Sequence, residues 1–172
     1  VGQVVIAPAA DSVLDLGGNF VYPRLTGQGL ERRVGRGRIE QIFPIGAAHA
    51  IVVAGGGAGA FDLQTGEPLW EIDCPARCGA VSRNRGLLGL AAGRCVSLWD
   101  TRYGQLLRTL DCQLGSVGSL AFSPDGETMA VGMDHGLVAL WKTTDGAGLS
   151  TLNPRSESGF EQVAISADGR IL

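Results

Sequence analysis

A glycine recurs along the chain at nearly constant intervals, and this repeat limits the possible folds more than any other feature. The intervals are 39, 38 and 42 residues, with an aromatic residue five positions before each glycine and a leucine three positions after it. The glycines are Gly27, Gly66, Gly104 and Gly146, the aromatics Tyr22, Phe61, Trp99 and Trp141, and the leucines Leu30, Leu69, Leu107 and Leu149. Periods of about 40 residues are typical of chains built from copies of one small unit.

Each unit has the pattern of four short antiparallel strands. Glycine makes up 27 of the 172 residues, which favours tight turns over helices, and no window has helical apolar periodicity. In the clearest unit the expected strands are Val117–Phe122, Thr128–Met133, Leu137–Trp141 and Leu149–Leu152. A turn of sequence Ser-Pro-Asp-Gly, ending at Gly126, follows the first strand, and the similar Ser-Ala-Asp-Gly ends at Gly169. The sequence therefore predicts an all-β chain.

Two segments resemble the WD-repeat family. Val96–Gly104 (Val-Ser-Leu-Trp-Asp-Thr-Arg-Tyr-Gly) is similar to its third strand with the Trp-Asp ending, and Leu120–Gly126 (Leu-Ala-Phe-Ser-Pro-Asp-Gly) to its first strand and turn. The resemblance covers the whole chain by spacing and residues 94–172 by motif. It implies a β-propeller of four-stranded blades, in a family that mostly provides platforms for protein partners rather than active sites.

The expected organisation is four blades and the start of a fifth, all in one propeller domain. The blades are expected at about 1–35, 36–76, 77–113 and 114–156, with the next beginning at 157–172. The last segment, Phe160–Ile165, alternates like an innermost strand but has no expected partner strand in this chain. We therefore expect a longer chain or a second copy to supply the rest of the ring.

The polar residues that often stiffen a WD-repeat blade are incomplete here. The family pattern combines a histidine, an aspartate, a hydroxyl on the second strand and the tryptophan. Asp134 stands seven residues before Trp141, as the family pattern requires. However, Cys112 and Gln113 occupy the Gly-His position, and the second strand, Met129–Met133, has no hydroxyl. Asp134, the repeat aromatics and Trp70 are expected as structural anchors of the blades, held mainly by apolar packing.

The second unit carries a competing resemblance. Ala60–Trp70 (Ala-Phe-Asp-Leu-Gln-Thr-Gly-Glu-Pro-Leu-Trp) is similar to the tryptophan-docking motif of pyrroloquinoline-quinone dehydrogenase propellers, in which the tryptophan locks neighbouring blades together. The motif occurs once, since Glu31, Arg108 and Ser150 stand at the position of Trp70 in the other units. The favoured interpretation is a blade variant without a cofactor. The alternative is the propeller of a quinone-dependent or related enzyme.

Other candidates for chemistry are weak. His49 and His135 are both expected in turns, and neither has a neighbouring residue pattern that recommends it as a general base. Gly55–Gly59 lacks the Gly-Lys-Ser/Thr ending of a phosphate loop and is better explained as a tight hairpin. The four cysteines do not form the two close pairs usual in structural zinc sites, so we expect four free thiols. They are Cys74, Cys78, Cys95 and Cys112.

The charge pattern favours a protein partner. The net charge is −3, without the basic bias usual in nucleic-acid-binding domains, and no apolar run is long enough to span a membrane. One basic cluster, formed by Arg32, Arg33, Arg36 and Arg38, is diluted by Glu31 and Glu40 and is expected to lie in a solvated loop between blades. The sequence predicts a non-catalytic, cytoplasmic interaction platform that has no cofactor or metal.

Overall fold

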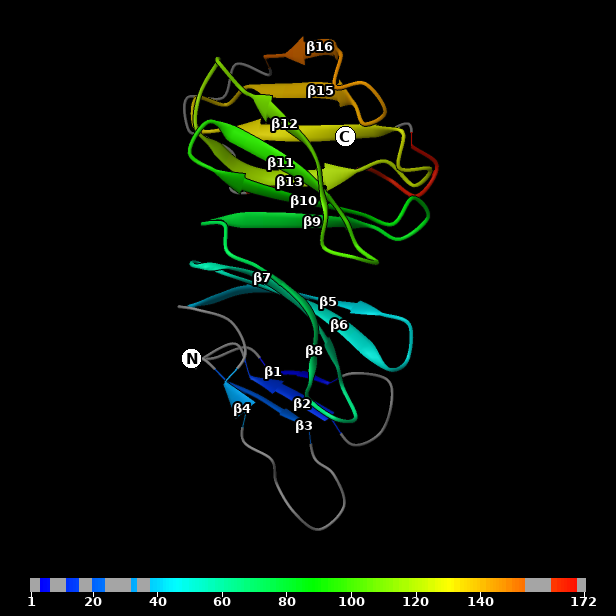
Figure 1. Ribbon diagram of the computed structural model, residues 1–172. Helices are drawn as coiled ribbons and strands as arrows, with labels where there is room; N and C mark the ends of the chain where they lie inside the picture. Colours follow the sequence, from blue (N-terminus) through cyan, green and yellow to red (C-terminus); the bar gives the residue numbers. More distant parts are fainter. Residues whose placement is uncertain are drawn as a thin grey trace. The chain divides into compact units, whose positions relative to one another are not determined.

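The computed structural model consists of β-strands and turns in the part of the chain it describes (Figure 1). Residues 38–153 and 162–169 are described in full, and the backbone is described for 4–6, 12–15, 20–23 and 32–33. No helix among these residues could cross a membrane. The strands form four four-stranded antiparallel sheets in chain order, which confirms the predicted all-β fold with four-stranded antiparallel blades.

The chain divides into two compact units, Val1–Ala76 and Arg77–Leu172. Each is described by itself below. Whether all the blades belong to one propeller domain stays a prediction.

The first unit contains two sheets. One is formed by β1 (Val4–Ile6), β2 (Ser12–Asp15), β3 (Phe20–Pro23) and β4 (Arg32–Arg33), and the other by β5 (Ile39–Ile45), β6 (His49–Ala54), β7 (Gly57–Asp62) and β8 (Pro68–Ile72). Strand β6 is buried from its second residue onward, as its run of apolar residues requires. Gly55 and Gly56 form the tight turn between β6 and β7, so the predicted hairpin is confirmed.

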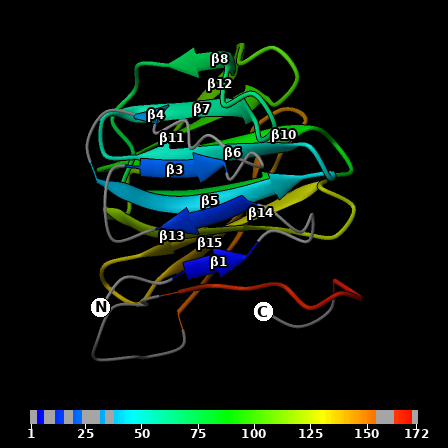
Figure 2. The ribbon, with the colours of Figure 1, turned by 90° about the horizontal axis from the view of Figure 1, so that it is seen from below.

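The second unit contains two sheets that share a core. One is formed by β9 (Cys78–Ser82), β10 (Leu87–Ala92), β11 (Cys95–Asp100) and β12 (Leu106–Asp111), and the other by β13 (Val117–Phe122), β14 (Thr128–Met133), β15 (Val138–Lys142) and β16 (Gly148–Leu152). Strands β13, β14 and β15 run side by side (Figures 1 and 2). The first strands of the two sheets, β9 and β13, also contact each other. Cys112, Val96, Met129 and Met133 are fully buried in the shared core.

The repeat glycines adopt a conformation that other residues rarely take. The backbone φ angle is +71° at Gly66, +63° at Gly104 and +76° at Gly146. Each glycine ends a turn before the outermost strand of its sheet, and its N–H bonds back to the carbonyl four residues earlier. The left-handed region costs residues with a Cβ roughly 1–2 kcal/mol, so the geometry explains why glycine marks the repeat.

Residues 162–169 pack against the sheet β13–β16. Val163 is 8% exposed and lies in a cluster with Ala130 and Val138. The turn that follows closes with a hydrogen bond from the Gly169 N–H to the Ser166 carbonyl at 2.8 Å, matching the bond from Gly126 to Ser123. Residues 162–166 form no strand, so the expectation that this segment has no partner strand in the chain stays a prediction, although Val163 packs on the apolar face of β14 and β15. Phe160 lies outside the described residues.

Candidate interaction surface

The turns before the outermost strands are held by carboxylates in two sheets. Asp62 Oδ1 accepts hydrogen bonds from the backbone N–H groups of Gln64 and Thr65, each at 2.8 Å. Asp100 Oδ1 accepts the same two bonds from Arg102 and Tyr103 at 2.8 Å. The bond from the Thr65 N–H is the largest cause that lowers the pKa of Asp62. The aspartate of the Trp-Asp ending is therefore a turn-forming residue.

The third of these turns is built differently. Lys142 stands where the other sheets have aspartate, and a lysine cannot accept a hydrogen bond. Asp145 Oδ1 instead accepts the Ala147 N–H at 3.0 Å, and this bond is the main cause that lowers the pKa of Asp145. The Lys142 Nζ lies 3.6 Å from Asp145 Oδ2.

The repeat aromatics lie at irregular points of the sheets. The pairing register with the outermost strand shifts at Ala60/Phe61, at Leu98/Trp99 and at Leu140/Trp141. Phe61 is 5% exposed, and Trp99 and Trp141 are partly buried. Tyr22, in β3, pairs with Val13 of β2, but the side chain of Tyr22 lies outside the described part. Their role as structural anchors stays a prediction.

The two indoles of the second unit have different surroundings. Trp99 Nε1 donates a hydrogen bond to Ser97 Oγ at 2.8 Å, and the Ser97 hydroxyl donates to the Leu90 carbonyl at 3.3 Å. Trp141 Nε1 is buried and has no hydrogen-bond partner among the described residues. Ala139 stands two residues before Trp141, where Ser97 stands before Trp99. Sequence reasoning looked for the hydroxyl on the second strand, whereas the structure provides it on the third.

Asp134 connects two loops rather than reaching the indole. Its Oδ1 accepts the Ser116 N–H at 3.2 Å and lies 3.6 Å from His135 Nε2. Its own N–H donates to the Ser116 carbonyl at 3.0 Å. Gly115 is needed here, because a Cβ at that position would lie 2.7 Å from Asp134 Oδ1. Asp134 thus fixes the loop before β13 against the β14–β15 hairpin.

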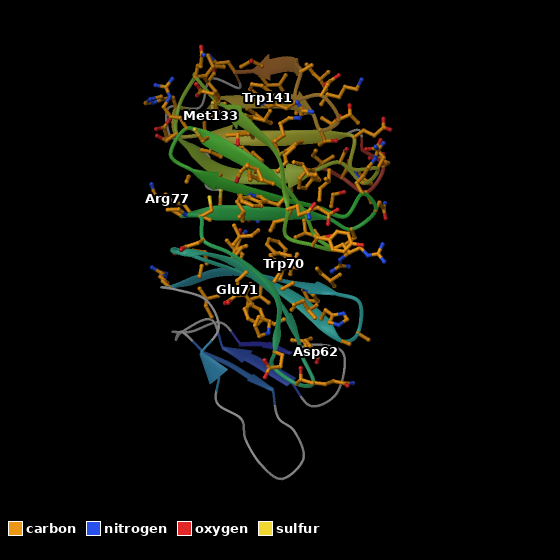
Figure 3. The ribbon with its side chains drawn as sticks, viewed as in Figure 1. Asp62, Trp70, Glu71, Arg77, Met133 and Trp141 are labelled. Atoms are coloured by element: carbon orange, nitrogen blue, oxygen red, sulfur yellow. The ribbon has the colours of Figure 1, made fainter. Side chains whose placement is uncertain are left out.

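Trp70 lies on the outermost strand of its sheet, β8. It pairs with Ala60 across β7 and β8 and is partly buried (Figure 3). Its role as an anchor also stays a prediction.

The two sheets of the second unit are joined through corresponding turns. Asn84 Nδ2 donates to the Pro124 carbonyl at 2.6 Å, and Arg85 Nε donates to the Asp125 carbonyl at 3.3 Å. The Arg85 guanidinium also forms an ion pair with Glu127. These contacts connect residues about one repeat apart, so the turn of one blade fixes the turn of the next.

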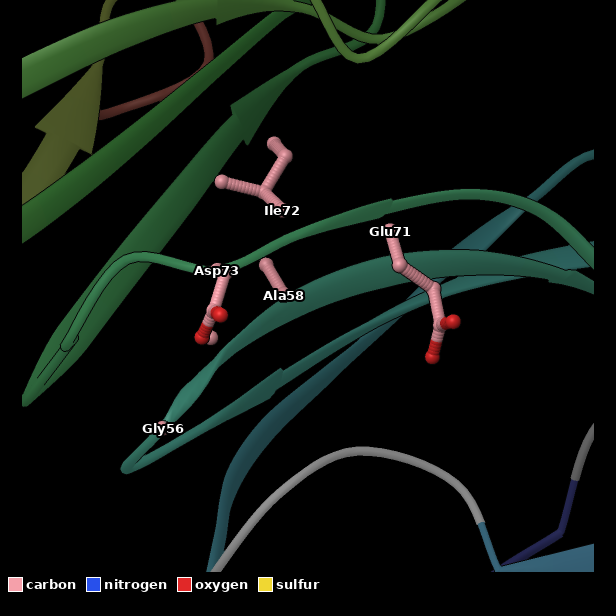
Figure 4. Close-up of a pocket in the computed structure, with 6 residues that line it drawn as sticks. Gly56, Ala58, Glu71, Ile72 and Asp73 are labelled. Atoms are coloured by element: carbon pink, nitrogen blue, oxygen red, sulfur yellow. The ribbon is translucent and has the colours of Figure 1, made fainter.

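The glycine-rich hairpin of the first unit borders a small cavity. Its lining combines Gly56–Ala58 with Glu71–Asp73, and its volume is about 190 Å³ (Figure 4). A Cβ on Gly57 would collide with the Ile72 carbonyl. The glycine is thus explained by the close approach of two backbone segments.

The histidines lie beside carboxylates at exposed positions. His49 is the first residue of β6, which corrects its expected place in the preceding turn, and its Nε2 lies 3.7 Å from Asp62 Oδ2. The strand starts earlier than expected because His49 pairs with both Ile45 and Asp62. His135 lies in the β14–β15 turn, as predicted.

The cysteines differ in burial and in their expected reactivity. All four are free thiols: Cys95 is exposed, Cys74 half-buried, and Cys78 and Cys112 buried. Burial raises the pKa of Cys78 and of Cys112 to about 11. Among the described residues no cluster of side chains could hold a metal ion.

The basic cluster lies mostly outside the described residues. Arg32 and Arg33 are described only as the backbone of β4, and Arg36 is outside the description. The Arg38 carbonyl accepts the Gly55 N–H at 2.9 Å, which ties the start of β5 to the hairpin. The function of this cluster stays open.

Comparison with known proteins gives partial similarity to one group. No family model matches the chain. Over 80 residues it is 35% identical to "Cell division cycle 20.1, cofactor of APC complex" of Arabidopsis thaliana, covering 45% of this chain and 18% of that protein. Two further Arabidopsis proteins, cell division cycle 20.4 and 20.5, are 36% and 34% identical over the same length. The chain thus matches less than a fifth of each relative.

These similarities support the WD-repeat resemblance. The quinone-type resemblance of Ala60–Trp70 gains no support from them.

Proposed function

We propose that this chain is part of a non-catalytic WD-repeat propeller that acts as a platform for a protein partner. The observation that carries the proposal is the construction of the turns: side chains hold them in place, while large side chains next to those contacts face solvent. Tyr103 is 60% exposed in a turn fixed by Asp100, and Leu114 is 51% exposed in the loop fixed by Asp134. Little ordering entropy is lost when a partner binds such preformed surfaces.

The relatives support a protein partner, because their names describe them as cofactors of the APC complex. We further propose that the protein works in the cytoplasm, where its four free thiols would remain reduced. The quinone-dependent enzyme is the alternative. Its support is the single docking motif that ends at Trp70.

Site-specific cross-linking tests the proposal. A photoreactive amino acid replaces Tyr103 in one variant and Leu114 in another, and buried Leu98 in a control. We expect at least one exposed position, but not the control, to cross-link one discrete protein in cells. That protein is then purified, and its binding to the unmodified chain is measured by calorimetry.

The result against the proposal is equally specific. Absence of a cross-linked protein that binds the unmodified chain would contradict the platform function. Oxidation of an alcohol by the chain with added pyrroloquinoline quinone, lost in Trp70→Ala, would favour the enzyme instead.

A further inference from the structure

Two turns at one end of the sheet β9–β12 are joined into a single surface. The Thr101 N–H donates to the Gly86 carbonyl at 2.8 Å, which places the turn after β9 beside the turn after β11. Arg83 lies in the first turn and Arg102 and Tyr103 in the second, and all three are exposed or partly exposed to solvent. We call these three residues the arginine–tyrosine end. The Arg102 guanidinium carbon lies 5.3 Å from the centre of the Tyr103 ring.

The arginine–tyrosine end carries positive charge that the described residues only partly offset. Neither Arg83 nor Arg102 forms an ion pair with any carboxylate in the described ranges 38–153 and 162–169. Arg85, in contrast, is paired with Glu127 in the next sheet. The nearest carboxylate in the same turn, that of Asp100, accepts the backbone N–H groups of Arg102 and Tyr103 rather than a guanidinium. Neither Arg83 nor Arg102 therefore has a carboxylate at ion-pair distance among the described residues.

The corresponding positions in the neighbouring sheet lack these positive charges. By strand register, Pro124 stands at the position of Arg83, Thr144 at that of Arg102 and Asp145 at that of Tyr103. The turn hydrogen bonds to the repeat glycine are nevertheless the same, with Gly104 bonded to Asp100 and Gly146 to Lys142. The arginines and the tyrosine are therefore not needed to make this fold.

From this charge pattern and this rigid geometry, we propose that the arginine–tyrosine end binds an acidic segment of the partner protein. Guanidinium groups form paired hydrogen bonds with carboxylates, and tyrosine and arginine are enriched where binding energy concentrates. The contact with the Tyr103 ring favours one orientation of the Arg102 guanidinium. This inference rests on the proposed platform function and adds the chemistry of the partner.

Charge-reversal variants of the whole chain test this surface. The probe is a fluorescein-labelled peptide of alternating glutamate and alanine, and its binding is measured by fluorescence anisotropy at low salt. We expect R83E/R102E to weaken binding by about tenfold. The control R77E/R94E changes the same charge at the opposite end of the same sheet and is expected to alter affinity by less than about twofold.

A second variant and two further probes complete the test. R83Q/R102Q, which removes the charges without reversing them, is expected to weaken binding by about threefold, with unfolding midpoints measured for every variant. The inference is overturned if R83E/R102E and R77E/R94E lose the same affinity for the peptide, or if the peptide does not bind the parent chain. Tighter binding to single-stranded DNA or to phosphatidylserine vesicles also overturns it. If the cross-linked partner still binds R83E/R102E normally, this surface is refuted while the platform function stands.

Discussion

The sheets β9–β12 and β13–β16 have closely matched backbones but different side-chain contacts. In both, the register shifts beside the tryptophan, at Leu98/Trp99 and Leu140/Trp141. Both also turn at positive-φ glycines, Gly104 and Gly146, before the outermost strand. The hydrogen bonds of the polar side chains, however, are not repeated. Asp100 fixes its turn where Lys142 cannot, and Ser97 bonds an indole where Ala139 cannot.

This difference indicates what the repeat preserves. Glycine positions and apolar strand faces determine the backbone, because left-handed turns and a buried core allow few substitutes. Individual hydrogen bonds each contribute only about 1 kcal/mol, so one blade can lack a bond that its neighbour has. Turn residues outside those bonds also differ between these two sheets, as Tyr103 and Asp145 do.

Thiol labelling gives the largest expected difference, because β9–β12 contain Cys78 and Cys95, and Cys112 follows directly, whereas β13–β16 contain no cysteine. At pH 8 in the native state, Cys95 should react at least about a hundredfold faster than Cys78 or Cys112, which are buried and have pKa values of about 11. The measurement is mass spectrometry after timed alkylation. In denaturant without reductant, four thiols should titrate. If the three cysteines are alkylated at equal rates in the native state, the core shared by the two sheets is open to solvent.

Alanine at the first turn of each sheet should separate backbone strain from packing. Gly86 and Gly126 have φ angles of +62° and +69°, so alanine strains both. At Gly126 the new Cβ would also collide with Ser82 and lie 2.6 Å from Arg85 Cγ, while at Gly86 the nearest atom lies at 3.3 Å. We expect G126A to lower the free energy of unfolding by about 3 kcal/mol and G86A by about 1 kcal/mol. Equal losses in urea unfolding would exclude the packing difference.

Exchanging the residues after the tryptophans tests the turn carboxylate. D100K removes the acceptor for two N–H groups and should lower the free energy of unfolding by about 1 kcal/mol. K142D should recover less than this, because the new carboxylate would lie close to Asp145. Denaturant titration of both variants measures the pair. If D100K leaves the free energy of unfolding unchanged, the carboxylate does not stabilise its turn.

Acid should lower the stability of the sheet β13–β16 through Asp125 and Asp145, and this is the smallest of the predicted effects. The hydrogen bond from Ser123 Oγ is the main cause that lowers the pKa of Asp125, and the bond from the Ala147 N–H is the main cause that lowers the pKa of Asp145. A carboxyl group with a lowered folded-state pKa stabilises the fold above its unfolded pKa, near 3.8, and loses that contribution as the pH falls through the folded value. D125N/D145N should therefore show a smaller loss of stability between pH 5 and pH 3 than the parent. An unchanged pH profile would contradict the assignment.

The sequence was sufficient to predict the features set by local chemistry. The strand and turn pattern around Gly104, Gly126 and Gly146 follows from residues close together in the chain, and the structure confirms it. The sequence also indicated an incomplete polar set beside Trp141, but on the second strand, whereas the structure has the difference on the third, at Ala139.

Contacts between blades could not be predicted in the same way. Arg85 and Glu127 are 42 residues apart, and nothing in the sequence around either residue indicates the other. The bond from Trp99 to Ser97 was missed because the family pattern directed attention to the second strand. The arginine–tyrosine end was also missed, since the bond from Thr101 to Gly86 joins two turns that are separate in the sequence.

The most direct test is to move the hydroxyl between the two sheets. If their backbones are equivalent, A139S should give Trp141 Nε1 an acceptor, as Ser97 does for Trp99. In equilibrium urea unfolding we predict that A139S raises the free energy of unfolding by about 1 kcal/mol and S97A lowers it by about the same amount. Hydrogen exchange of the Trp141 indole should slow in A139S. A loss of stability in A139S as large as that in S97A, with unchanged indole exchange, would contradict the account.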